Sequence, residues 1–300
     1  MTPRLIFRSA TLALAFGTAV VLARAQSTVP SQATSLSNLG ELLDRLPNFP
    51  GFDLPGFMPK DVFQFYSSPH FGDLVHRDFM RVPVGLRAKI DQNYQAHLEI
   101  EGYFTHGLGH AAGYGLDRLE TGIKYDSTRP SPTSPNLLWS TGIDFATPLD
   151  HPPMEITDGY RHTVPYVAVS KLLAPDWSLT GYSTLGIDLL AHTDLPSNFG
   201  RNQLHSNSFT LSGGVTRDWK TFQTLLTASY SSTALLSDEH HQVFGLRPAV
   251  VFPLTRWQGR HTRLTATFGG WSIWGPDGHE LGASGSVRLE FNYKTQGIAR

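Results

Sequence analysis

Apolar and polar residues alternate one by one through the last long segment of the chain, LGASGSVRLEFNYK at positions 281–294. Leu281, Val287 and Phe291 belong to the apolar set, whereas Arg288 and Glu290 belong to a polar set that carries charge. Successive side chains of a strand point to opposite faces of the sheet. The segment therefore predicts a β-strand with one apolar face and one charged face.

Eleven other segments alternate in the same way or more weakly, so the pattern predicts twelve strands. They begin at Asp61, Arg81, Tyr94, Ala111, Leu137, Gly159, Trp177, Ser206, Thr221, His241, Thr262 and Leu281. Most reach the roughly 9–11 residues that a tilted strand needs to cross an outer membrane. The prediction is an all-β fold, a transmembrane antiparallel up-and-down β-barrel of twelve strands, with about ten strands as the alternative.

The predicted connections fall into two groups by length. Short turns are expected at Asp91–Asn93, Ala174–Asp176 and Asp218–Lys220, and they alternate with longer loops such as Thr193–His205. Outer-membrane barrels have short turns at the periplasmic rim and longer loops at the outer rim, here called the short-turn rim and the long-loop rim. The Pro-rich connection 127–135 is long for the short-turn rim, to which the strand order assigns it.

Tryptophan lies where a membrane interface would hold it, because the indole ring has an apolar body and a polar edge. The tryptophans beside predicted short turns are Trp139, Trp177, Trp219 and Trp257. Trp271 and Trp274 lie by a connection of the long-loop rim. This placement predicts aromatic girdles at both rims.

The first sixty residues are not expected to belong to the barrel. Residues 1–25 predict a secretory signal peptide, with a basic start, the apolar run Ala10–Leu22 and an A-x-A cleavage site at Ala23–Ala25, although a membrane anchor is an alternative. Residues 26–60 are interpreted as a periplasmic linker with a short helix, followed by a Pro- and Gly-rich stretch. That stretch either packs on the base of the domain or enters the lumen as a plug.

The barrel is assigned to residues 61–294, and residues 295–300 form a C-terminal tail. The tail follows Phe291 and Tyr293, whereas barrel-assembly signals commonly end on an aromatic residue. Closure of the barrel by this last strand is expected all the same. The barrel-assembly machinery is a predicted partner.

Composition narrows the classes of function. Charged residues make up only 16% of the chain and the net charge is −1, which disfavours nucleic-acid binding. The mean hydropathy of −0.19 excludes a helical polytopic membrane protein, and the absence of Cys excludes disulfides and zinc–thiolate sites. With an export signal, these features predict the outer membrane as destination, outer-membrane lipids as partners and no cofactor. A soluble secreted β protein is the alternative.

Charged side chains of the strands are assigned to the lumen, because an Arg or Lys facing lipid at mid-depth costs about 2–4 kcal/mol. The candidate lumen-lining residues are Arg87, His97, Glu99, Glu101, Arg118, Glu120, Asp144, Asp188, Arg247, Arg263, Arg288 and Glu290. Arg81, Lys89 and Lys124 share the same polar faces. These charges either fill a sealed barrel with ion pairs or line a hydrated path, so a passive or gated conduit for small molecules is the leading function and a structural barrel an alternative.

The long-loop rim is rich in histidine, of which the chain has thirteen. His106, His110, His240 and His241 are weak candidates for a metal site, and a rim that charges near pH 6 or scattered polar histidines are the other interpretations. His205 near Ser206 and Ser208 suggests a third function, an outer-membrane lipid-modifying hydrolase, because a His can activate a Ser nucleophile. No carboxylate completes that site in the sequence, and no catalytic residue is assigned.

One region goes beyond a general barrel pattern. Residues 113–125, GYGLDRLETGIKY, together with Thr147-Pro148, Val167–Lys171 and Leu185-Gly186, resemble in motif and order the outer-membrane barrels associated with phenol meta-cleavage pathways. That family usually has Pro-Thr-Gly where this chain has Thr-Pro-Leu at 147–149. The resemblance covers about residues 113–192 and implies a transport-type barrel for small compounds, aromatic ones among them, without identifying a binding residue.

Overall fold

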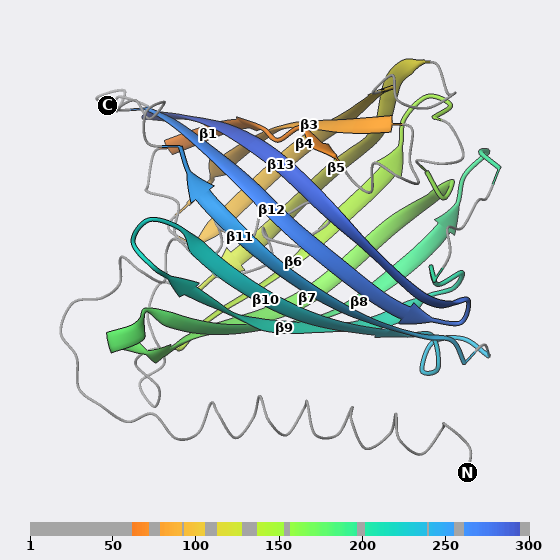
Figure 1. Cartoon of the computed structure of the whole chain (residues 1–300). Helices are drawn as coiled ribbons and strands as arrows, with labels where there is room; N and C mark the ends of the chain where they lie inside the picture. Colours follow the sequence, from red (N-terminus) through yellow and green to blue (C-terminus); the bar gives the residue numbers. More distant parts are fainter. Residues whose placement is uncertain are drawn as a thin grey trace, which may run out of the picture.

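The computed structural model describes residues 62–71, 79–91, 93–105, 113–127, 137–152, 157–196, 202–238, 240–254 and 261–294, and these form a closed antiparallel β-barrel (Figure 1). The strands are β1 (Val62–Ser67), β2 (His70–Phe71), β3 (Phe79–Lys89), β4 (Tyr94–Thr105), β5 (Tyr114–Asp126), β6 (Leu137–Pro148), β7 (Tyr160–Ala174), β8 (Leu179–His192), β9 (Ser208–Asp218), β10 (Gln223–Ser232), β11 (Gln242–Pro253), β12 (Thr262–Gly275) and β13 (Gly278–Lys294). The predicted signal peptide, linker, plug and tail lie outside the described residues.

The first strand of the barrel is divided in two. β1 and β2 each pair with β3 on one side and with β13 on the other. Ser68 and Pro69 separate them, and the Ser68 N–H donates to the carbonyl of Pro83 at 3.1 Å. Counted as one strand, β1 and β2 complete a barrel of twelve strands, which confirms the predicted number.

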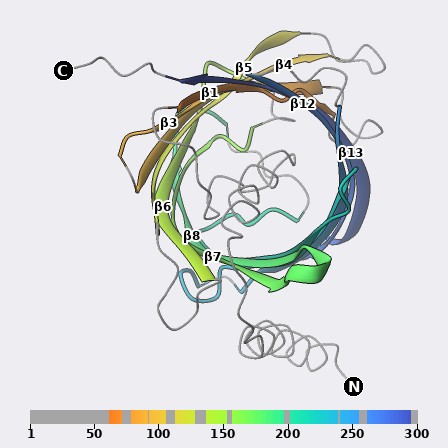
Figure 2. The ribbon, with the colours of Figure 1, turned by 90° about the vertical axis from the view of Figure 1, so that its left-hand side faces the viewer.

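β13 closes the barrel against β1, from Val62 opposite Lys294 to Ser67 opposite Leu289. Seen along the barrel, the strands form a complete ring (Figure 2). Closure removes the unpaired N–H and C=O groups of a free sheet edge. The prediction that the segment 281–294 is the closing strand is confirmed, and this strand is 17 residues long.

Predicted strand starts differ from the structure where a turn intervenes. Pro175–Trp177 form a single 3-10 turn, so β8 begins at Leu179 and not at Trp177. β13 begins at Gly278, three residues before the predicted start, because Pro276 and Asp277 alone form the turn from β12. Gly278, the first residue after this turn, adopts a φ of 103°, a conformation that favours glycine because it lacks a Cβ. No helix of the described residues is long and apolar enough to cross a membrane.

The outward face of the barrel is apolar. Leu86, Leu98, Leu185, Leu226 and Phe252 are exposed on five different strands. The buried set, in contrast, contains Arg, Glu, Gln, Ser and Thr side chains, because the polar side of each strand faces the inside. This inversion of a soluble fold confirms the predicted assignment of the apolar sets to the outer surface.

Aromatic residues gather at the short-turn rim. Tyr125 packs between Tyr94 and Trp139, with ring centroids 5.3 Å apart in both pairs. Trp177 and Trp219 are exposed beside the turns on either side of β8 and β9. At the long-loop rim, Trp274 packs on Phe244 at 5.5 Å. These residues form the predicted girdles at both rims. Trp271 is the exception, because it pairs with Gly282 on the inward face that Thr267 and Ser286 share, and its ring lies over Gly282. Trp257 lies outside the described residues.

Candidate functional site

The inner wall carries the predicted lumen residues. Cross-strand pairs share a face of the sheet, and Arg87–His97, Glu101–Arg118 and Arg247–Thr227 are such inward pairs. The other predicted residues on this face are Glu99, Glu120, Asp144, Asp188, Arg288 and Glu290. Arg263 has Glu290 as its cross-strand partner but is exposed, because it lies one residue from the end of β12 at the short-turn rim.

The two sides of the inner wall differ in chemistry. Charged side chains come mainly from β3, β4, β5, β6 and β13. From β8 to β12 the buried inward groups are mainly hydroxyls, among them those of Tyr182, Thr184, Thr216, Thr227, Thr265 and Thr267. The lumen therefore has a charged side and a hydroxyl side. Alternation alone predicted inward polarity but not this division.

Two arginines share one buried carboxylate on the charged side. The Glu101 carboxylate lies 3.1 Å from an Arg81 nitrogen and 3.4 Å from an Arg118 nitrogen. Arg118 also lies 3.7 Å from Glu120, whose side chain is 32% exposed, and the Arg118 side chain is itself 35% exposed. Arg118 and Glu120 therefore present ionised groups to water inside the barrel, while Glu101 is nearly fully covered.

Asp117 is an inward residue that strict alternation misses. The register between β4 and β5 shifts at Glu101 and Gly102, so Asp117 is an extra residue without a cross-strand partner on β4. Such a β-bulge turns a side chain out of its expected face. Asp117 is 2% exposed and its carboxylate lies 3.8 Å from Arg81. The signal in the sequence that could have revealed this is the Asp117 carboxylate itself, because it stands in an otherwise apolar set and a carboxylate facing lipid would be energetically costly.

Tyr66 was not among the predicted lumen residues, yet it lies at the centre of the charged side. Its ring is 1% exposed, with the guanidinium of Arg288 4.1 Å and that of Arg87 4.9 Å from the ring centroid. Its hydroxyl donates to Glu99 at 2.7 Å. The ring covers Gly85, its cross-strand partner on β3, where any side chain would occupy the space of the ring.

His97 connects three strands of the charged side. Its Nε2 lies 3.7 Å from Glu120 on β5, and its Nδ1 lies 4.0 Å from Asp144 on β6. Gly122 lies between these groups, and a Cβ there would overlap the Asp144 carboxylate and the imidazole. The absence of a side chain at position 122 is what lets His97 reach Asp144.

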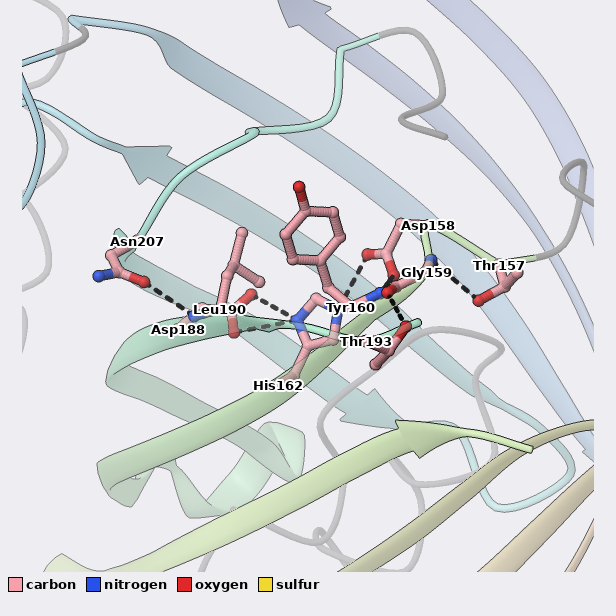
Figure 3. Close-up of polar contacts among 9 residues, drawn as sticks. All are labelled: Thr157, Asp158, Gly159, Tyr160, His162, Asp188, Leu190, Thr193 and Asn207. Carbon is pink, nitrogen blue, oxygen red and sulfur yellow. Dashed lines mark hydrogen bonds and ion pairs between the residues drawn. The ribbon is translucent and has the colours of Figure 1, made fainter. Parts of the chain in front are cut away.

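A second histidine is held between two carboxylates at the long-loop rim (Figure 3). The Nε2 of His162 lies 2.9 Å from Asp158, and its Nδ1 lies 3.0 Å from Asp188 on β8. A carboxylate accepts hydrogen bonds, so both ring nitrogens donate and the imidazole carries a positive charge. The Asp158–His162–Asp188 clasp therefore ties the loop before β7 to the neighbouring strand.

Asp158 lies in the loop before β7, where its surroundings have opposing effects on the pKa of its carboxyl group. Burial acts to raise the pKa of Asp158, but the hydrogen bond and positive charge of His162 outweigh it, so the pKa lies below the ordinary value of 3.8. The clasp is thus ionised across the neutral range. The hypothesis of a rim that charges near pH 6 does not apply to it.

The loop between β8 and β9 is fastened to a turn that is four strands away. The Asn202 N–H donates to Asp277 at 2.9 Å, and the Asp277 N–H donates to the Asn202 side chain at 3.1 Å. Asp277 belongs to the β12–β13 turn, and Asn202 is 4% exposed. Along the barrel axis, the teal part of this connection lies within the ring of strands (Figure 2). This Asn202–Asp277 latch holds the loop over the lumen.

The other predicted candidates are not brought into one site. His205 is exposed, whereas Ser208 at the start of β9 is 5% exposed, so only His205 is open to solvent. Among the described residues, His240 and His241 included, no group of three or more His, Asp, Glu or Cys side chains is arranged to hold a metal ion. His106 and His110 lie outside the described residues.

No protein-family model and no curated protein matches the chain. Among solved structures, the chain is similar to an outer membrane channel from Pseudomonas putida F1, with 12% identity over 79% of this chain and 97% of the other, and a TM-score of 0.48. It is also similar to the KdgM porin in complex with disordered oligogalacturonate, with 8% identity over 78% and 99% of the two chains and a TM-score of 0.44.

The chain is likewise similar to OccD1 (OprD), with 10% identity over 82% of this chain and 72% of that one, and a TM-score of 0.37. At such identities and TM-scores these similarities carry no information on solute or mechanism. The resemblance of residues 113–192 to the barrels of phenol meta-cleavage pathways stays a prediction.

Proposed function

We propose that the chain is an outer-membrane barrel through which small molecules pass passively. The observation that carries this proposal is the presence of ionised side chains inside the closed barrel that are still partly open to solvent. Arg118, Glu120 and Asp188 have side chains 35%, 32% and 29% exposed. A sealed barrel filled by ion pairs would cover all three side chains to the extent that Glu101 and Arg288 are covered in this structure.

The size of the barrel supports a narrow path. A barrel of about eight strands has an interior just filled by side chains, and one of about 16–18 strands encloses a wide aqueous channel. Twelve strands lie between these cases. Inward tyrosines and arginines and the loop held by Asn202 narrow the interior further. A narrow lumen with mixed charge selects small solutes by size and polarity.

The lining favours hydrophilic solutes. Carboxylates and guanidinium groups face one side of the lumen and hydroxyls face the other, so a polar solute finds hydrogen-bond partners on both sides. Aromatic compounds, which the sequence resemblance implies, are the second solute class. Swelling of liposomes that contain the purified chain separates the two, since small sugars or amino acids should enter faster than benzoate of similar size.

Location and conduction are tested separately. Cell fractionation should recover the chain in outer membranes, and release without detergent would contradict the membrane assignment. In a planar bilayer the refolded chain should give discrete current steps. A chain that shows heat-modifiable gel migration, and so is folded, but gives no current would favour the structural barrel.

A further inference from the structure

An outward-facing arginine lies over two exposed indole rings at the short-turn rim. The guanidinium carbon of Arg217 is 3.6 Å from the ring centroid of Trp219 and 5.2 Å from that of Trp177. Arg217 pairs across strands with Leu179 and Thr224, and it follows the exposed Val215 by two residues, so it shares the outer face. A charge is tolerated there only at the depth of the lipid headgroups.

The cluster is built by two adjacent turns and not by chance contacts of long side chains. The Asp218 N–H donates to the carbonyl of Ser178, which joins the turn after Trp177 to the end of β9. Trp219 is fixed by its indole N–H, which donates to Thr224 at 3.0 Å, and by stacking on Phe222 at 5.9 Å. Trp219 is thus held in place beside Arg217, and the backbone of the turn that carries Trp177 is joined to the same end of β9.

The charge of Arg217 is not neutralised by its neighbours. Among the described residues no carboxylate forms an ion pair with its guanidinium, and its Nε has no hydrogen-bond partner there. The adjacent Asp218 carboxylate accepts instead from the Lys220 N–H at 2.8 Å and from Gln223. Lys220 is exposed in the same turn and supplies a second positive charge.

We propose that Arg217, Trp177 and Trp219 form a binding site for the phosphate of a glycerophospholipid headgroup. The planar guanidinium can donate two parallel hydrogen bonds to a phosphate, while the indole rings cover its faces and pack on glycerol and upper acyl groups. The occupant is a lipid because the site faces outward at the aromatic girdle, where lipid headgroups lie next to it. Free phosphate could reach the site only from the aqueous side. The proposal rests on the membrane placement of the barrel and not on conduction.

Native mass spectrometry of the full chain, purified in a maltoside detergent and titrated with phosphatidylglycerol, tests the site. The wild-type chain should retain one lipid, and Arg217→Gln should bind it about tenfold more weakly, since hydrogen bonds to charged groups are lost. The lipid affinity of Arg217→Lys should fall between those of the wild type and Arg217→Gln, because lysine keeps the positive charge but cannot donate two parallel hydrogen bonds. The matched control is Arg161→Gln, an exposed strand arginine that lies at the long-loop rim.

Heat-modifiable gel migration identifies folded variants, and only these are titrated. Equal lipid retention by Arg217→Gln and Arg161→Gln would overturn the proposal, as would loss of the lipid in both. Inorganic phosphate that displaces the lipid at millimolar concentration would also contradict it, because the site would then recognise the anion alone. Single-channel conductance of Arg217→Gln should equal that of wild type, so failure of the lipid site and failure of the conduit are distinguishable.

Discussion

Individual inward residues show how the barrel combines stability with a polar interior. Tyr66 uses its ring to cover Gly85, its faces to contact two arginines and its hydroxyl to bind Glu99. Arg118 contacts Glu101 and Glu120 but keeps part of its side chain in solvent. On this wall of the barrel, Tyr66 therefore has a structural role, whereas the neighbouring Arg118 faces the solvent of the lumen.

Arg118→Gln should shift the ion selectivity of the channel towards cations. The change removes one positive charge from the lumen and leaves the carboxylates of Glu101 and Glu120 less compensated. The measurement is the reversal potential in a planar bilayer under a salt gradient. Arg161→Gln, with its exposed side chain at the long-loop rim, is the control, and an unchanged reversal potential in Arg118→Gln would contradict this role.

Gly85→Ala should destabilise the barrel by about 1–3 kcal/mol, the usual cost of overpacking. The added methyl group would occupy the space of the Tyr66 ring, which two arginines also hold in place. Gly270→Ala is the control, since a Cβ there meets only the Gly282 carbonyl at 3.4 Å. Urea unfolding in detergent measures both, and equal stability of the two variants would show that Tyr66 is not packed as described.

At the scale of strands and loops, the alternation of the sequence predicted which face of the sheet a side chain occupies wherever the strand is regular. The alternation in Tyr94–Phe104 placed His97, Glu99 and Glu101 inward correctly. It failed at Asp117, because a bulge changes the face of a residue without changing the apolar pattern around it. It also could not reveal the clasp or the latch. The clasp depends on the register between β7 and β8, and the latch joins a loop to a turn four strands away.

The Asp158–His162–Asp188 clasp should be insensitive to pH between about 5 and 8. The pKa of Asp158 is depressed in the folded chain, so its contribution to stability is present above its unfolded pKa and is lost as pH falls through the folded value. That window lies below the ordinary value of 3.8. Channel noise recorded from pH 8 down to 3 should change only at the acid end, and a transition near pH 6 that His162→Gln abolishes would contradict this.

Asn202→Gly should open the long-loop rim. Glycine accepts the positive φ of 57° at this position but removes the side chain that binds the Asp277 N–H. Release of the loop should raise the single-channel conductance and its fluctuations. Ser178→Gly makes the same kind of change at a φ of 48° in a turn of the short-turn rim and should leave conductance as it is.

At the scale of the whole molecule, the barrel, its number of strands and its inverted surface followed from sequence because each depends on a repeated pattern. The first strand was predicted as one short segment, Asp61–Ser68, whereas the structure extends it to Phe71 past Pro69. The division into a charged side and a hydroxyl side was not predicted, because it depends on which strands are neighbours around the ring. The solute is likewise a property of the assembled lumen.

The central claim is that water and small solutes reach the inward side chains through an open lumen. The chain contains no Cys, so a single introduced thiol reports on its own surroundings. Current through Glu120→Cys and Ile123→Cys channels, recorded while a water-soluble methanethiosulfonate reagent is added, tests the claim most directly. Glu120 faces the lumen and Ile123 the outer surface. We expect a stepwise fall in current for Glu120→Cys alone; folded channels without current, or equal responses in both variants, would contradict an open lumen.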